Sequence, residues 1–313
     1  MEYQKSKLNL PIVRLRRVWY TLSLLACGIS VLSLAVFGLK FGVDFTGGSL
    51  LDLEYSAARP PLESIKEKIS QTLSLDALTQ PRDDKGLIIR LSEIDEATHQ
   101  TLLVAFREQA QSIDPNNQID ELRFESFGPS IGDELRRNAL TSIGLVMIAI
   151  IAYLAYAFRR VSRPVASWKF GTVAVIALAH NVLIVVGLFS LLGHFYGTEV
   201  NGLFVSALLT LMGFSVHDTI VTLDRIRENL VVKQEATFTD VVHMSINETF
   251  VRSVNTSTVV LVLISIYLFG GDTIRDFSLA LALGIIIGTY SSIFVASPLL
   301  VTWNLLVKKF KNS

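Results

Sequence analysis

The chain has 313 residues, of which 50% are hydrophobic and 18% are charged, with a mean hydropathy of +0.47 and a formal net charge of zero. This concentration of apolar residues excludes an ordinary soluble globular protein. A zero net charge gives no sign of a polyanionic partner, and we expect no binding to nucleic acid.

Six apolar segments are long enough to cross the hydrocarbon core of a bilayer, which takes about 20 helical residues. They cover residues 18–39, 138–158, 170–193, 201–223, 253–270 and 277–305. The last segment is long, and it can tilt or extend beyond the bilayer. The sequence therefore predicts a polytopic α-helical membrane protein with six transmembrane helices. Its expected parts are an N-terminal segment 1–17, a first span 18–39, a folded domain 40–136, spans two to six within 137–305 and a tail 306–313.

Lysine and arginine predict the orientation, because they gather on the cytoplasmic side of membrane proteins. Four basic segments fall on one face if the chain crosses six times. They contain Lys5, Lys7, Arg14, Arg16 and Arg17, then Arg159, Arg160, Arg163 and Lys169, then Arg225, Arg227 and Lys233, and finally Lys308, Lys309 and Lys311. The segments on the other face, 194–200 and 271–276, contain only Arg275. Both termini are therefore expected in the cytoplasm, with the 40–136 domain outside it.

The domain between the first two spans is acidic, with 17 acidic and 8 basic residues from Phe41 to Asp133. Alternating and amphipathic patterns predict its elements in chain order. These are a strand 49–55, a helix from Pro60-Pro61 to about Leu73, strands 77–80 and 86–91 around a turn 81–85, a helix 96–113 and a strand 119–127. The order β-α-β-β-α-β predicts a ferredoxin-like α+β domain.

Motifs of soluble enzymes are absent from the sequence: it contains no G-x-x-x-x-G-K-[ST], no H-E-x-x-H and no G-x-S-x-G. Thr46-Gly47-Gly48 is the nearest approach to a glycine-rich loop, and it lacks the lysine that phosphate binding needs. We therefore expect no catalytic residue, no metal, no cofactor and no ATPase activity.

Ionisable residues inside apolar spans are costly, and they mark an ion path or a structural pair. At about 1.5 Å per helical residue, Asp218 lies roughly 26 Å and Arg252 roughly 27 Å from the outer ends of their spans. On neighbouring antiparallel helices these two side chains could lie level and meet. An arginine favours the ionised carboxylate while burial opposes it, so a site alternating between an Asp–Arg pair and a protonated Asp218 is physically reasonable.

Each of these residues also has a purely structural interpretation. Asp218 and Arg252 could be interfacial anchors or a fixed ion pair. His180 could be a hydrogen-bonded packing histidine, and His217, about 100° around the helix from Asp218, is expected to face elsewhere. Small residues predict close helix packing near this site, and they are Gly213, Gly284, Gly288 and Ser257.

The order of these pieces resembles the SecF subunits of the bacterial Sec protein-export apparatus, in the SecD/SecF family. The resemblance covers nearly the whole chain. The segments that carry it are Phe41–Gly48 with Asp44, Phe45, Gly47 and Gly48, then Phe127–Leu135 with Gly128 and Pro129, His180-Asn181, His217–Val221, Asp224–Asn229, Arg252-Ser253, Asn255–Thr258, Phe269–Gly271 and Phe277–Ser292.

This resemblance implies a bacterial plasma-membrane accessory subunit that uses the proton gradient, with a SecD-like subunit, to promote late steps of preprotein export. It implies the SecYEG translocon, the translocating preprotein and membrane lipid as partners, and a relation to resistance-nodulation-division transporters. Asp218 and Arg252 match positions implicated there in proton passage. Two departures are Asn181, where the family usually has aspartate, and His217, where it usually has asparagine.

Two alternatives stay open at this point. A passive assembly subunit would tolerate loss of Asp218 and Arg252, and would depend only on packing residues such as Gly284. Half of a small-solute exporter would need a partner and a large apolar pocket in the external domain.

Overall fold

The computed structural model describes residues 9–73, 75, 77–158, 167–233 and 235–311. Within it the chain divides into two compact units, one formed by residues 1–40 with 141–313 and the other by Phe41–Leu140. Five basic residues of the predicted orientation lie outside the described residues: Lys5, Lys7, Arg159, Arg160 and Arg163. Each unit is described by itself.

The smaller unit is built around a four-stranded antiparallel sheet in the order β2-β3-β1-β4. Its elements are β1 (Gly48–Tyr55), α3 (Leu62–Leu73), β2 (Leu78–Arg82), β3 (Gly86–Leu91), α4 (Glu96–Ile113) and β4 (Ile119–Phe127), preceded by the one-turn helix α2 (Val43–Thr46). The order β-α-β-β-α-β is the predicted one. In the sheet, β1 lies between β3 and β4, as two interleaved β-α-β units require.

The first hairpin differs from the prediction. Strand β2 continues through Pro81 and Arg82, which the sequence placed in the turn, and the turn is shortened to residues 83–85. Proline is tolerated because β2 is an edge strand, where a missing N–H removes no central ladder bond. Asp83 makes the tight turn with a positive φ of 52°.

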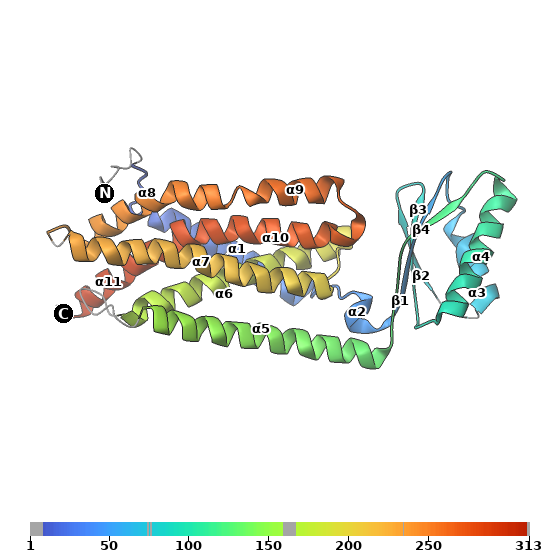
Figure 1. The fold of residues 1–313 in the computed structure, drawn as a ribbon, viewed down its shortest axis with the longest axis horizontal. Helices are drawn as coiled ribbons and strands as arrows, with labels where there is room; N and C mark the ends of the chain where they lie inside the picture. Colours follow the sequence, from blue (N-terminus) through green and yellow to red (C-terminus); the bar gives the residue numbers. More distant parts are fainter. Residues whose placement is uncertain (1–8, 74, 76, 159–166, 234, 312–313) are drawn as a thin grey trace. The chain divides into compact units, whose positions relative to one another are not determined.

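Helices α3 and α4 cover one face of this sheet (Figure 1). The helices contribute side chains four residues apart, such as Ile65 with Ile69 and Leu102 with Phe106, and β1 contributes alternate residues. Burial of the Tyr55 side chain in this core raises the pKa of its hydroxyl to about 12. This core is large enough for a single small α/β domain.

The larger unit is a bundle of long apolar helices. Among the described residues six helical segments are long and apolar enough to cross a membrane. They are α1 (Arg16–Val36), α5 (Pro129–Ala157), α6 (Ser167–Tyr196), α7 (Gly202–Val232), α8 (Phe238–Thr256) continued by α9 (Val259–Phe269), and α10 (Asp272–Ser291) continued by the π-helical turn η1 (Ser292–Ala296) and α11 (Ser297–Lys311).

Two spans differ in detail from the sequence prediction. The fifth begins at Phe238, 15 residues before the predicted start at Ser253. Its first half is amphipathic, and hydropathy averaged along the sequence does not detect such a segment. At about 1.5 Å per residue, the 32 residues of Phe238–Phe269 exceed the hydrocarbon thickness of about 30 Å. The sixth span is one long helical segment, as predicted, but the π turn interrupts it.

Burial separates inner from outer spans. In the most apolar window of each span, 67% of the last span is buried, against 6% of α5. Exposed side chains on α1 and α5 are large and apolar, such as Leu24, Leu32, Leu145 and Ile148. Helices α6, α7 and α10 therefore form the centre of the bundle.

The N-terminal segment closes one end of this bundle against α8 (Figure 1). The Leu10 backbone N–H donates to Asn247 Oδ1 over 2.8 Å, and His243 Nε2 lies 2.8 Å from Asn9 Oδ1. Ile12 and Val13 are buried in the core of the bundle. The chain before α1 and the α7–α8 connection therefore lie at the same end of the bundle.

Candidate functional site

Asp218 is a buried carboxylate in the middle of the bundle. It lies on α7 and is 5% exposed. The Ser253 hydroxyl, on α8, donates to Asp218 Oδ1 over 2.7 Å. The hydroxyl of Ser292, the first residue of the π turn, donates to Oδ2. A buried ionised carboxylate needs such donors, because it can only accept hydrogen bonds.

The two serines belong to a closed ring of polar contacts. The Ser257 hydroxyl donates to the Ser253 carbonyl over 2.8 Å, and it lies 2.6 Å from Thr289 Oγ1 on α10. The Ser292 hydroxyl also points at the Thr289 carbonyl, 3.1 Å away. The ring therefore joins α7, α8, α10 and η1 through Asp218.

Both spans that supply the serines depart from a regular α-helix at this level. The α8–α9 segment is interrupted at residues 257–258, where Ser257 caps α8. The last span contains the π turn, in which the Ser297 hydroxyl donates to the Ser292 carbonyl five residues earlier, over 3.0 Å. Single π turns inside α-helices occur frequently at functional sites.

Glycines bring α10 against α7 beside this ring. A Cβ added to Gly284 would lie 2.7 Å from Leu211 Cδ1, and one added to Gly288 would lie 3.3 Å from Ser215 Cβ. Gly284, Gly288 and Ser257 therefore lie where helices approach each other closely. Gly213 does not, because it is exposed and a Cβ there meets nothing within 4 Å. It lies on the outward face of α7, and it makes no packing contact of the predicted kind with the residues that the structure describes.

His180 and Asn181 form a separate polar cluster on α6. His180 Nδ1 lies 2.9 Å from Asn181 Oδ1, and Asn181 Nδ2 donates to the Ser215 hydroxyl over 2.6 Å. Ser215 is one helical turn before Asp218 on α7. His180 makes no hydrogen bond to Asp218 among the described residues, and its hydrogen bond to Asn181 fits the packing interpretation.

Arg252 and His217 both lie on the outside of the bundle. The side chains of both are exposed, whereas their neighbours Ser253 and Asp218 are buried. Among the described residues no ion pair joins Arg252 to Asp218, so the expected Asp–Arg contact is not formed. Counting residues along the helices gave the correct depth for this part of α8 relative to Asp218. A step of one residue turns a side chain by about 100° around the helix, and Ser253 is therefore the residue that faces Asp218. The same step explains why His217 faces elsewhere, as predicted.

The two glycine-containing segments, 42–48 and 127–135, meet in the smaller unit. Gly47 and Gly48 have positive φ values of 70° and 107°, and a Cβ on Gly47 would lie 2.9 Å from Pro129 Cα. A Cβ on Gly132 would lie 3.0 Å from the Gly47 nitrogen. Asp44 lies in the first turn of α2, Phe45 is 8% exposed, and the atoms nearest to a Cβ added on Gly128 belong to the Glu93 side chain. These segments therefore serve close backbone packing.

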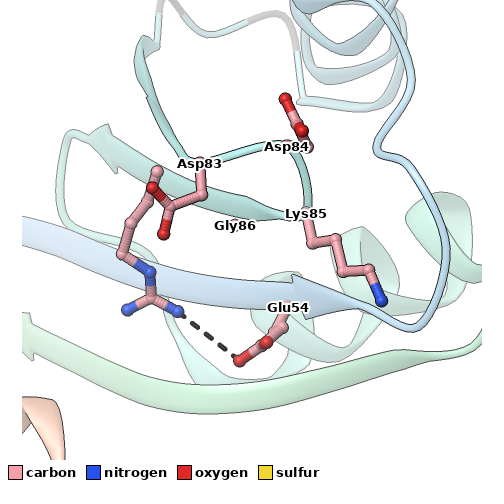
Figure 2. Close-up of a pocket in the computed structure, with 6 residues that line it drawn as sticks. Glu54, Asp83, Asp84, Lys85 and Gly86 are labelled. Atoms are coloured by element: carbon pink, nitrogen blue, oxygen red, sulfur yellow. Dashed lines mark ion pairs between the residues drawn. The ribbon is translucent and has the colours of Figure 1, made fainter.

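The smaller unit has a shallow hollow of about 310 Å³ at the β2–β3 turn (Figure 2). Charged residues line it, including Glu54, Asp83, Asp84 and Lys85. Its cations already have partners: Arg82 Nη2 lies 3.7 Å from Glu54 Oε2, and Lys85 Nζ donates to the Ser56 carbonyl. Its lining is charged, whereas a solute pocket is lined mainly by apolar side chains.

Among the described residues, no three His, Cys, Asp or Glu side chains gather as metal ligands would. The chemistry that the bundle offers is instead that of one buried carboxylate between two hydroxyl donors. Such a group can take up and release a proton, and its hydrogen bonds change when it does.

The model of the family "Protein export membrane protein SecD/SecF, C-terminal" matches residues 106–305, which is more than half of the chain. The chain belongs to the SecD/SecF family. A second model, "SecD/SecF GG Motif", matches residues 32–58, where Gly47 and Gly48 lie.

Relatives in the SecD/SecF family resemble the chain over most of its length. It is 42% identical to the protein translocase subunit SecF of Thermobaculum terrenum, with 94% of each chain covered. It is 34% identical to the protein translocase subunit SecDF of Brucella abortus, covering 95% of this chain and 38% of that protein.

The fold resembles a solved structure of the same family. This is the crystal structure of SecDF, described as a translocon-associated membrane protein, from Thermus thermophilus. The TM-score is 0.78 at 30% identity, with 96% of this chain covered. The chain spans 40% of the length of that protein.

Proposed function

We propose that this chain is an accessory subunit of the Sec preprotein translocase that works with a SecD-like subunit and uses the proton motive force to promote late steps of export. Family membership and relatives named as translocase subunits support the translocation role. The observation that carries proton use is Asp218, a buried carboxylate inside a membrane span with two hydroxyl donors.

A SecD-like partner is supported by two independent observations. SecDF relatives carry a segment similar to this chain within a protein more than twice as long. In addition, the exposed face of α7 does not resemble a lipid-facing surface. Its exposed residues between 206 and 217 are Ser206, Thr210, Gly213 and His217, spaced four, three and four residues apart.

Such a stripe of small and polar residues is typical of contacts between membrane helices. The exposed faces of α1 and α5 carry large apolar side chains instead. We therefore place the SecD-like partner against α7. Arg252, exposed on the neighbouring α8, would then meet protein or water at this contact rather than hydrocarbon.

The proposed orientation puts both termini in the cytoplasm and the 41–140 unit on the other side of the plasma membrane. Arg14, Arg16 and Arg17 lie at the start of α1 or just before it, and the N-terminal segment contacts α8. Arg225, Arg227 and Lys233 lie at that same end, on α7 and directly after it. Basic residues at one end of the bundle favour the cytoplasmic side.

The other partners in this proposal are the SecYEG translocon, the preprotein in transit and membrane lipid. The Thermus relative is described as a translocon-associated membrane protein, and this supports the first of these partners. The 41–140 unit is the part that would meet the preprotein after it crosses. It moves with Asp218 protonation in this proposal.

The decisive experiment is export into membrane vesicles that contain the full chain and its SecD-like partner, with and without a proton gradient. Asp218→Asn keeps the size of the side chain but cannot bind and release a proton, so we expect it to abolish gradient stimulation while the complex still assembles. Ser215→Ala, one turn away, is the matched control. Normal stimulation by an assembled Asp218→Asn complex would leave a passive assembly role in place of proton coupling.

A further inference from the structure

The Ser292 hydroxyl has one proton and two acceptors within reach. These are the Asp218 carboxylate and the Thr289 carbonyl, which is 3.1 Å away on the preceding turn of the same span. A hydroxyl donates only one hydrogen bond at a time. While Asp218 is ionised, the charge-assisted bond to the carboxylate is the stronger one.

Protonation of Asp218 reverses this preference. A carboxylic acid carries one O–H donor in place of an acceptor site, so its two oxygens can no longer both accept from Ser253 and Ser292 as they do here. If the proton is taken up on Oδ2, that O–H donates to Ser292 Oγ. Ser292 then donates its own proton to the Thr289 carbonyl.

We propose that Ser292 is a positioning residue that switches between these two acceptors and so transmits the protonation state of Asp218 to the π turn of the last span. This inference rests on the proposed proton coupling at Asp218. Ser292 is itself part of the π turn, and its carbonyl accepts a hydrogen bond from the Ser297 hydroxyl across that turn. The switch also acts on α8, because Thr289 contacts Ser257 at the break after α8.

Other ionisable groups on α7 and on the helices packed around it do not take over this role. None of them contacts the Asp218 carboxylate among the described residues. They include His217 and Asp224 on α7, Arg252 and Glu248 on α8, His180 on α6 and Tyr290 on α10. Tyr290 instead contacts Ser23 and Trp19 on α1.

The structural test is amide hydrogen exchange of segment 289–297 in the full chain with its partner in lipid bilayers. Asp218→Asn mimics the neutral acid, and Ser292→Ala removes the switch. We expect each to speed exchange about tenfold, as the loss of one charge-assisted hydrogen bond implies. The double variant should exchange no faster than either single variant, since both remove the same link.

Controls separate the hydroxyl from general packing. Ser291→Ala removes an equally buried hydroxyl that donates to the Gly288 carbonyl, and its exchange should match the wild type. Ser292→Thr retains a hydroxyl and should restore both slow exchange and gradient-stimulated export. Additive effects of Asp218→Asn and Ser292→Ala, or unchanged exchange in Asp218→Asn, would overturn the switch.

The export measurement separates this inference from the proposed function. If Asp218→Asn abolishes gradient stimulation but Ser292→Ala leaves it intact, proton coupling stands and the switch is wrong. If Asp218→Asn leaves stimulation intact, proton coupling itself is wrong, whatever the exchange rates are.

Discussion

The Ser253 hydroxyl donates to the Asp218 carboxylate over 2.7 Å and joins the fifth span to the fourth at the centre of the bundle. The residue that does this is the neighbour of Arg252, the cation that depth counting placed level with Asp218. A neutral hydroxyl gives the carboxylate a hydrogen bond without an opposite charge, unlike the ion pair with Arg252 that depth counting suggested. Asp218 is therefore held by hydroxyl donors and not by the predicted ion pair, and the proton role stays part of the proposed function.

Gly187, which the sequence did not single out, should be sensitive to substitution. A Cβ added there would lie 2.2 Å from Ser30 Cβ and 2.5 Å from Ser30 Cα, so α1 and α6 would have to separate. We expect Gly187→Ala to lower the unfolding free energy by about 2 kcal/mol or more, as overpacking does. Thermal unfolding in detergent measures it.

The control for this substitution lies on the same helix. Gly171 has open space around its Cβ position. Gly171→Ala should be neutral or stabilise α6 by up to about 1 kcal/mol, because alanine favours helices. Equal effects of the two substitutions would contradict the α1–α6 contact.

Gly213 should matter for association rather than for folding. Its Cβ position is open and it lies in the exposed stripe of α7, so Gly213→Phe leaves this chain's own packing intact. We expect it to reduce co-purification with the SecD-like partner at least severalfold. Ile148→Phe on the apolar exposed face of α5 is the matched control and should have no effect. If both variants retain the partner equally, the contact lies elsewhere.

Glu248 holds α8 against the end of α7. Its carboxylate accepts from Arg225 Nε over 2.6 Å and from Asn229 Nδ2 over 2.8 Å, and Lys233 Nζ lies 3.5 Å away. Its side chain is 17% exposed. Glu248→Gln should lower the free energy of unfolding by about 1 kcal/mol. Hydrogen bonds to a charged group that is mostly buried stabilise the fold more than an ion pair on the surface does.

Glu228 provides the comparison for Glu248. It pairs with the same Arg225, but its side chain is 52% exposed. Glu228→Gln should change the stability by less than about 0.5 kcal/mol. Chemical denaturation of the two variants side by side tests this order, and the reverse order would show that the α7–α8 network has been misassigned.

The backbone conformation of the smaller unit requires glycine at position 48. It has a φ of 107°, and a Cβ there would lie 2.7 Å from the Leu91 carbonyl oxygen, beside the β1–β3 pairing. Gly48→Ala should destabilise the sheet by about 2 kcal/mol or more, through strain and the clash. Amide exchange of β1 and β3 in the full chain measures this locally.

The control for Gly48 comes from the second glycine-containing segment. A Cβ on Gly128 meets only the end of the flexible Glu93 side chain, at 3.3 Å. Gly128→Ala should therefore change exchange in the sheet little. Protection of β1 and β3 that survives Gly48→Ala would mean that the positive φ is not required.

The sequence determined the long-range plan of this protein. Apolar length alone predicted the six helical segments, and period-two and period-3.6 patterns predicted the four strands and the helices α3 and α4 of the 41–140 unit, because these signals are local. One error of the prediction also concerned a local pattern. The amphipathic half of the fifth span was missed, because averaging hydropathy along a window does not detect an apolar stripe on one face.

Only the tertiary structure decided which side chains meet. The sequence singled out Asp218 as an ionisable residue in an apolar span, but it could not join it to Ser253 and Ser292, because depth along a helix says nothing about the direction of a side chain around it. The direction of each side chain is set by packing at Gly284, Gly288 and Gly187, and by the extra residue of the π turn. The ring around Asp218 is therefore a property of how the helices pack, which no single segment encodes.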